Sequence, residues 1–117
     1  MSQLRREDGE GGKVMNTAIM KNWSVTSNQN GFIAPELQRY MLQGDIYEDS
    51  RGFFPDGSQV HTSSIRDIRD CGTHKIVATS RTEYKVFPDD VDPEYEKAFP
   101  GAYERLSMLA NDLERGR

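Results

Sequence analysis

The stretch from Pro55 to Phe87 constrains the fold most, because turn signals divide it into short segments of strand-like composition. It opens with Pro55-Asp56-Gly57, in which proline presets φ, aspartate bonds its local backbone and glycine accepts a positive φ. Further turns are predicted at 70–73 and 79–82. The segments between these turns are rich in Val, Ile, Thr and Tyr, residue types that fit a pleated surface. This stretch therefore predicts a meander of short antiparallel strands.

Two more strands are predicted before this stretch, over Trp23–Thr26 and Tyr40–Tyr47. Gly44 lies inside the second, and a glycine there marks a bulge or a close approach of another backbone. Trp23 is the only tryptophan. An indole buries a large area, which predicts a core anchor, and the alternative role is a stacking platform for a base.

The third strand, over 60–68, breaks strict alternation because Val60 and Ile65 have opposite parity. One extra residue within His61-Thr62-Ser63-Ser64 would restore the alternation, so we predict a bulge there. Two readings of these four polar residues stay open. They belong to the solvated face of an edge strand, or they form one wall of a polar ligand site.

The last third of the chain predicts helices. Asp92 is a plausible N-cap and Pro93 suits the first helical position, so a helix is expected over 93–99. Pro100-Gly101 then interrupts the helix, and a second one is predicted over 102–114. Its apolar residues form one stripe, which either covers the sheet or pairs with the same helix of a neighbouring copy. The stripe consists of Tyr103, Leu106, Ala110 and Leu113.

The predicted fold class is α+β, with a small antiparallel five-stranded β-sheet or half-barrel followed by one or two C-terminal α-helices. We expect one domain, divided into a disordered tail over 1–19, a β meander over 20–90 and a helical segment over 91–117. Met15 and Met20 are alternative starts. A polar loop after the first strand and a short turn at Ala34–Leu37 are expected as well. Only 35 % of residues are hydrophobic and the mean hydropathy is −0.78, so we expect a second subunit to complete the core.

Charge and cysteine content exclude several classes. A net charge of −4 argues against a general nucleic-acid binder, but permits a small anion held by a few local arginines. Cys71 is the only cysteine and there are two histidines, so we expect no disulfide, no metal site and no cofactor. The chain lacks the apolar runs of a membrane span or a signal peptide, which predicts a cytoplasmic protein.

No catalytic motif is present, so we expect binding rather than an enzyme. The groups that remain suit a nucleotide, because arginines bind phosphate through two parallel bonds and aromatic rings stack on bases. Arg81 and Arg105 are predicted to clamp a phosphate, with Phe54 or Tyr103 against a base. The arginines considered are Arg51, Arg66, Arg69, Arg81 and Arg105, and the rings are Phe53, Phe54, Tyr84 and Tyr103. His61, Thr62 and Ser63 are predicted to contact ribose or phosphate.

A family resemblance rests on short motifs between Trp23 and Tyr95. They are Trp23-Ser24-Val25, Leu42-Gln43-Gly44-Asp45-Ile46-Tyr47, Asp56-Gly57, Val60-His61-Thr62-Ser63-Ser64-Ile65 and Val77-Ala78-Thr79 with Tyr84. This pattern resembles the first family of phage anti-Thoeris sponge proteins. In those proteins a five-stranded sheet precedes helices, and the protein sequesters a cyclic ADP-ribose signal. The last hairpin turn here carries Arg81 where the family pattern leads us to expect glycine, which places a guanidinium in that turn.

The resemblance implies a phage-type anti-defence protein that binds a cyclic nucleotide signal without cleaving it, in the cytoplasm of the host. One alternative is a phage protein that inhibits a host defence enzyme by direct binding, and another is an enzyme that cleaves a nucleotide. The apolar stripe predicts a homo-oligomer built from dimers, up to a hexamer, with no membrane partner. The ligand pocket is expected where the sheet meets the C-terminal helix, across a subunit boundary.

Overall fold

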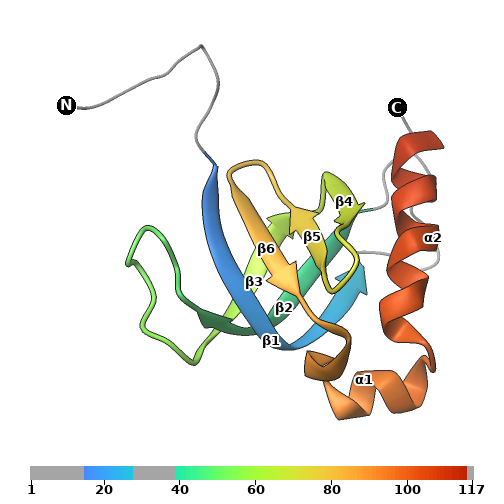
Figure 1. The fold of residues 1–117 in the computed structure, drawn as a ribbon, viewed down its shortest axis with the longest axis horizontal. Helices are drawn as coiled ribbons and strands as arrows, with labels where there is room; N and C mark the ends of the chain where they lie inside the picture. The colour runs from blue at the N-terminus through green and yellow to red at the C-terminus, as the bar shows by residue number, and fades with distance from the viewer. Residues whose placement is uncertain (1–14, 28–38, 116–117) are drawn as a thin grey trace.

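A computed structural model describes residues 15–27 and 39–115 of the 117-residue chain. They form a six-stranded mixed sheet followed by two helices (Figure 1). The strands are β1 (Asn16–Ser27), β2 (Tyr40–Tyr47), β3 (Ser58–Ser64), β4 (Asp67–Asp70), β5 (Lys75–Ala78) and β6 (Thr82–Val86). A 3-10 turn (Pro88–Asp90) leads to α1 (Pro93–Ala98) and α2 (Ala102–Arg115). The predicted α+β class, with a sheet followed by helices, is confirmed.

The sheet order is β3-β2-β1-β6-β5-β4, and every pair is antiparallel except β1 with β6. The prediction of five antiparallel strands is therefore wrong in two respects. The predicted third strand bends at residues 65–66 and is divided into β3 and β4. If β3 and β4 are counted as one bent strand, the meander has five strands that alternate in direction. Its first and fifth strands, β1 and β6, then run in the same direction, so the pair that closes the sheet is parallel.

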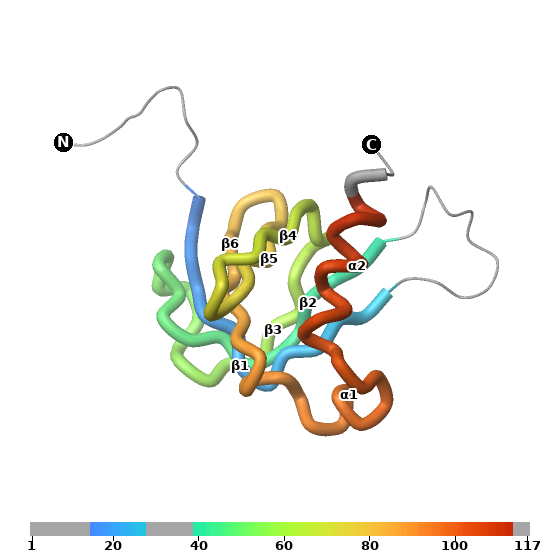
Figure 2. The backbone as a smooth tube through the Cα atoms, turned by 45° about the vertical axis from the view of Figure 1, so that its right-hand side comes forward, coloured from blue at the N-terminus to red at the C-terminus, as the bar shows by residue number. Residues whose placement is uncertain are grey.

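The two edges of this sheet meet at the bend. Ile65 donates its backbone N–H to the Tyr40 carbonyl at 2.7 Å, at the start of β2. The next residue, Arg66, donates to the Ala78 carbonyl at 2.7 Å, at the end of β5. Consecutive amides thus bond strands on opposite sides of the sheet, which curls into the barrel-like form seen in Figure 2.

β1 begins at Asn16, so the predicted boundary between tail and sheet at residue 20 is corrected. The reason is local alternation, because Ala18 and Met20 are buried while Thr17 is exposed. Residues 1–14 of the predicted tail, the polar loop after Ser27 and the predicted turn at Ala34–Leu37 lie outside the described residues. Within the described ranges, no helix combines the length and apolar character needed to span a membrane.

The bulge predicted in β3 is present, and a second bulge lies in β1 opposite Gly44. In β1, Lys21 pairs with Asp45 but Ser24 pairs with Gln43, so two residues of β1 face Gly44 alone. In β3, the register shifts by one residue between the positions opposite Met41 and Gln43. Gly44 is therefore the close-approach position that its place inside a strand predicted.

Trp23 anchors the core, as predicted from its size. Its side chain is fully buried, and its indole Nε1 donates to the Phe87 carbonyl at 2.9 Å. The rings of Tyr95 and Tyr103 lie 6.4 Å from the indole, one from each helix. Leu106 of α2 is also buried, so the predicted stripe covers the sheet at this position.

The two helices meet at a corner fixed by capping. Asp92 accepts a hydrogen bond from the Glu94 amide at 3.2 Å, which confirms the predicted N-cap of α1. Glu96 of α1 accepts from the amides of Gly101 at 2.8 Å and Ala102 at 3.3 Å, so one carboxylate caps the start of α2. α2 therefore turns back along the curled sheet, as Figure 1 shows.

Candidate functional site

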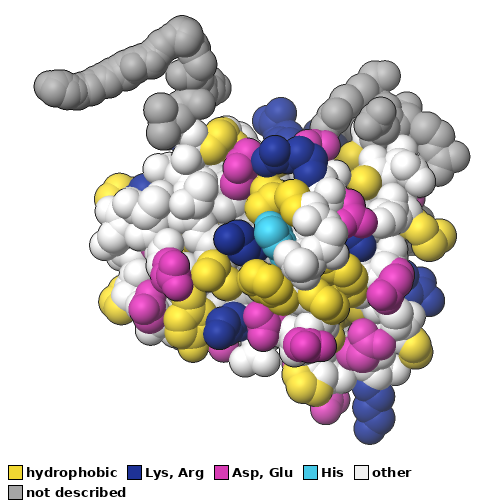
Figure 3. Space-filling view, in the orientation of Figure 1, with side chains coloured by type: hydrophobic (Ala, Val, Ile, Leu, Met, Phe, Trp, Pro, Cys, Tyr) yellow, Lys and Arg dark blue, Asp and Glu magenta, His cyan; other side chains and the backbone are white. Residues whose placement is uncertain are grey.

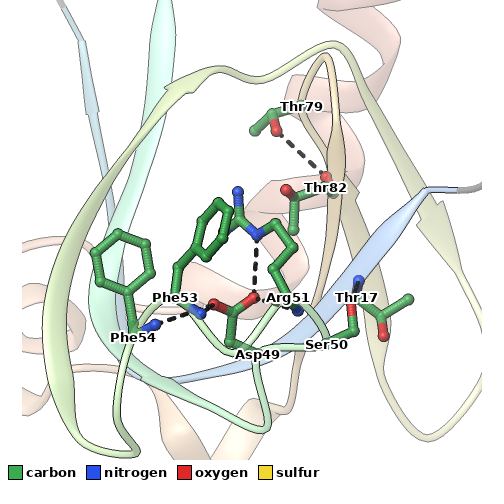
Figure 4. A network of polar contacts seen from close by, with 8 residues as sticks. All are labelled: Thr17, Asp49, Ser50, Arg51, Phe53, Phe54, Thr79 and Thr82. Carbon is green, nitrogen blue, oxygen red and sulfur yellow. Dashed lines mark hydrogen bonds and ion pairs between the residues drawn. The ribbon is translucent and has the colours of Figure 1, made fainter.

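The loop between β2 and β3 is organised by the carboxylate of Asp49, whose side chain is fully buried. One oxygen accepts from the Arg51 amide at 3.3 Å and from its Nε at 3.2 Å. The other oxygen accepts from the amides of Phe53 at 3.0 Å and Phe54 at 3.2 Å (Figure 4). Gly52 completes the turn with a positive φ of 70°. A single side chain therefore fixes the path of residues 49–54.

Asp49 is ionised at neutral pH. Burial is the largest influence on its pKa and acts to raise it, but the hydrogen bonds from Arg51 and from the Phe54 amide outweigh burial. Together with the positive charge of Arg51, they leave the pKa of Asp49 below its ordinary value. Asp49 and Arg51 are therefore a true ion pair at neutral pH.

Arg51 is held beside two aromatic rings. Its guanidinium carbon lies 5.1 Å from the centre of the Phe53 ring and 5.9 Å from that of Phe54. Asp49 engages Nε, and Tyr84 also hydrogen-bonds with the guanidinium, so the terminal N–H groups that neither of them uses are left for a ligand. The Arg51 side chain is 23 % exposed, which leaves it within reach of a ligand.

The buried Tyr84 carries a hydroxyl group within hydrogen-bonding reach of Arg51 and of the buried Thr82. Burial raises the pKa of Tyr84, while hydrogen bonding with Thr82 and Arg51 acts in the opposite direction. Figure 4 shows Arg51 lying between its own loop and the turn that carries Thr79 and Thr82. The guanidinium therefore lies between the loop 49–54 and the turn 79–82, at one end of the barrel.

The first residues of β1 join these two segments. Thr17 exchanges two hydrogen bonds with Ser50, both at 2.9 Å. The adjacent Asn16 donates its amide to the Arg81 carbonyl at 3.0 Å. We call the loop 49–54 and the turn 79–82 the barrel mouth, because β1 holds them at the same end of the sheet.

The structure brings two of the predicted site residues, Phe54 and Arg81, to the barrel mouth. His61 and Ser63 are exposed on β3. The hydroxyl of Thr62 accepts from the Leu42 amide at 2.9 Å and donates to the Ser63 carbonyl at 2.8 Å. Thr62 is therefore occupied in closing the bulge, where it replaces a backbone partner of β2.

Arg105 and Tyr103 lie elsewhere, on α2. In Figures 1 and 2 the start of α2 and the turn between β5 and β6 are at opposite ends of the sheet, so the predicted clamp of Arg81 and Arg105 is not assembled within one chain. Arg105 donates from Nε to the Pro100 carbonyl at 3.0 Å. Tyr103 is half-buried and packs against the core, with Lys75 Nζ 3.9 Å from its ring centre.

A groove of about 210 Å³ lies where the sheet meets the helices, the region in which the sequence predicted a ligand pocket across a subunit boundary. Ligand binding there stays a prediction. Arg105 lies on the groove wall near Tyr95. Burial raises the pKa of Tyr95, against a hydrogen bond with the Val25 backbone and the positive charge of Arg105. The other lining residues include Tyr40, Phe99, Met108, Leu109 and Asp112.

Sequence reasoning named Arg51 and Phe53 among the groups suited to a nucleotide but left them out of the predicted site. The available signal was Asp49 with Gly52 three residues later, a pattern typical of a type I turn. That turn would have placed the intervening Arg51 beside the exposed rings.

The fold and the barrel mouth thus define a small α+β protein with an arginine and two phenylalanines at one end of a curled mixed sheet. Comparisons with protein-family models, curated proteins and solved structures find no match to this chain. In the described part of the chain, no three His, Cys, Asp or Glu side chains come together in a group that could hold a metal ion.

Proposed function

We propose that the protein binds a small anionic nucleotide at the barrel mouth and does not cleave it. The observation that carries the proposal is Arg51, which is oriented by the buried Asp49 and lies beside the rings of Phe53 and Phe54. The proposed ligand is a cyclic ADP-ribose-like signal, and the proposed role is that of a phage-type anti-defence protein in the host cytoplasm, in line with the resemblance in sequence.

Each part of such a ligand finds a matching group. The terminal N–H groups of Arg51 that Asp49 and Tyr84 do not use can donate to phosphate oxygens, and a charge-assisted bond of this kind contributes about 1.5–3 kcal/mol. Phe53 is 71 % exposed, so its ring face is open to a base. Arg81, in the neighbouring turn, adds a second positive charge. Because Asp49 already fixes Arg51, little side-chain entropy is lost on binding.

The charge state of the surrounding groups favours capture over turnover. The raised pKa of Tyr84 keeps its hydroxyl protonated, and the lowered pKa of Asp49 makes it a weak base. Efficient proton transfer needs a group that titrates near the working pH. These two groups therefore support a binding site better than a catalytic one.

The charge distribution is compatible with a local anion site. On the face shown in Figure 3, Lys and Arg side chains lie at the upper edge, at the centre and lower down, interspersed with Asp and Glu side chains. The net charge of −4 therefore leaves positive groups available locally. An anion bound to Arg51 also lies near the acidic loop residues Glu48 and Asp56. Salt screens this repulsion together with the attraction to Arg51, so added salt should weaken binding less than it does for a basic protein.

Isothermal titration calorimetry with cyclic ADP-ribose, ADP-ribose and ADP tests the proposal. Arg51→Lys keeps the charge but loses the planar fork, and Phe53→Ala removes the exposed ring. Each variant should bind about 10- to 100-fold more weakly, as expected when one such contact is lost. Phe99→Ala, at the far end of the sheet, is the matched control and should change affinity less than about twofold.

Chromatography of the nucleotide after release should recover it intact. Fragments that accumulate with time would instead support an enzyme. If the parent protein binds none of the three nucleotides, the proposal fails.

A second function, inhibition of a host enzyme by direct binding, is favoured by the exposure of Phe53. An exposed aromatic residue on a rigid loop is a typical hot spot of a protein interface. On this reading, Phe53→Ala would abolish inhibition of the partner enzyme while Arg51→Lys and nucleotide addition would have no effect.

A further inference from the structure

The first two residues of β1 bond with the two halves of the barrel mouth. Asn16 donates its amide to the Arg81 carbonyl at 3.0 Å, in the turn 79–82. Thr17 donates its amide to the Ser50 hydroxyl and accepts from the Ser50 amide, both at 2.9 Å (Figure 4). The backbone groups of successive residues in a strand point toward opposite neighbours, so two adjacent residues can hold two segments at once.

The pairing that supports these bonds is short. β1 pairs with β6 over four residue pairs, from Asn16 opposite Thr82 to Ile19 opposite Lys85. We call residues 16–19 the strap. Few hydrogen bonds hold the strap and it lies at one end of the sheet, so it opens at a lower free energy than the central strands do.

The loop 49–54 has two different anchors. The Asp49 carboxylate fixes its internal shape, because it accepts from amides within the loop. The two bonds between Ser50 and the strap instead fix where the loop lies relative to the rest of the mouth. Arg51 and Arg81 lie in the two halves of the mouth, thirty residues apart in the chain, and their like charges oppose a close approach. The strap, which bonds with both halves, holds them together against this repulsion.

We propose that the strap assembles the nucleotide site and that Ser50 is the positioning residue through which it acts. This inference rests on the proposed function, because it concerns the same site. A ligand that contacts Arg51 and Arg81 binds best when both halves of the mouth are in place. Binding and strap pairing are then coupled equilibria, so the ligand stabilises the paired strap and loss of the strap weakens ligand binding by the same factor.

Ser50→Pro tests the anchor without removing the turn that carries it. The Gly52 amide donates to the Asp49 carbonyl at 2.9 Å, so Ser50 is the second residue of that turn. Proline is favoured at this position of a type I turn, and it has neither the N–H nor the hydroxyl that bond with Thr17. In isothermal titration calorimetry of the full chain with cyclic ADP-ribose, this variant should bind about tenfold more weakly than the parent.

Two matched variants separate positioning from a general loss of stability. Ser50→Thr keeps both the hydroxyl and the amide, so its affinity should stay within about twofold of the parent. Thr17→Val changes a side chain that makes neither bond and should behave in the same way. Circular dichroism checks that each variant is folded. If Ser50→Pro is not folded, Ser50→Ala, which loses the hydroxyl alone, takes its place with an expected loss of about threefold.

Amide hydrogen exchange of the parent gives a readout that a merely structural bond would not change. Saturating cyclic ADP-ribose should slow exchange at the Asn16 and Thr17 amides by about fivefold or more, since it favours the paired strap. The Phe99 amide, which donates to the Tyr95 carbonyl at 2.8 Å, lies at the other end of the sheet and is the control. Its exchange should not respond to the nucleotide.

The outcomes separate this inference from the proposed function. A parent that binds none of the nucleotides overturns both. A parent that binds cyclic ADP-ribose, together with a folded Ser50→Pro variant that binds it equally well, overturns the strap alone. Unchanged exchange at Thr17 when the parent binds the nucleotide also overturns the strap alone.

Discussion

Replacing Gly44 by Ala should destabilise the protein more than any other single methyl group added at a described glycine. Gly44 lies in β2 opposite the β1 bulge. A Cβ atom there would lie 2.6 Å from the Lys21 carbonyl oxygen, 2.9 Å from Met20 Cγ and 3.1 Å from Trp23 Cα. Two of these three atoms belong to the backbone of a strand, so they cannot move by a change of rotamer.

The expected cost follows from these contacts. Non-bonded carbon atoms prefer separations of about 3.5–4.0 Å, so each contact lies well inside the repulsive range. Overpacking of a core costs about 1–3 kcal/mol, and relief here requires β1 to move away from β2. We therefore expect a loss of about 3 kcal/mol in the free energy of unfolding. For a domain of this size, that loss lowers the Tm by roughly 12–24 °C.

Gly52→Ala is the matched control, because the same methyl group is added in open space. No atom lies within 4 Å of its Cβ position, and its φ of +70° imposes only the cost of a left-handed conformation, about 1–2 kcal/mol. Urea denaturation of both variants gives the comparison. If Gly44→Ala loses no more stability than Gly52→Ala, the argument from close packing at the bulge is refuted.

Three further predictions concern polar groups. The pKa of Asp49 is lowered, so its charge stabilises the fold above about pH 4, and this contribution is lost as the pH falls further. In urea denaturation, Asp49→Asn should therefore be less stable than the parent at pH 7 but not at about pH 2.5. Thr62→Val leaves the Leu42 amide without its acceptor and should cost about 1–3 kcal/mol in the same assay, whereas Ser63→Ala on the exposed side should cost under about 0.5. The buried hydroxyl of Tyr103 has no hydrogen-bond partner among the described residues, so Tyr103→Phe should leave the Tm unchanged or raise it by a few degrees.

Local features of the fold could be predicted from the sequence. The Asp92 cap and the β3 bulge depend on residues close in sequence, and capping chemistry or periodicity identifies them. The predicted start of the sheet at Met20 lies too late in the chain, because β1 extends back to Asn16 as an alternating segment. Pairing between distant strands leaves no such local signal. The parallel pairing of β1 with β6 follows only once the bend at residues 65–66 is known.

The site was predictable only in part. Phe54 and Arg81 share one end of the sheet because β1 holds both segments, and strand composition alone cannot show this. Arg105 lines the groove beside α2, but its predicted partnership with Arg81 would require opposite ends of the sheet to coincide. The position of Arg51 depends on the loop conformation that the Asp49 carboxylate imposes, and residue types alone do not reveal that conformation.

The parallel closure has a consequence for synthesis of the chain. β1 leaves the ribosome before its second neighbour, β6, which begins more than fifty residues after β1 ends. Until then, one edge of β1 has unpaired amides and carbonyls that can bind the edge of another nascent chain. Emergence of β6 is therefore the step that covers this edge, and a chain truncated before Thr82 should require a chaperone to stay unaggregated.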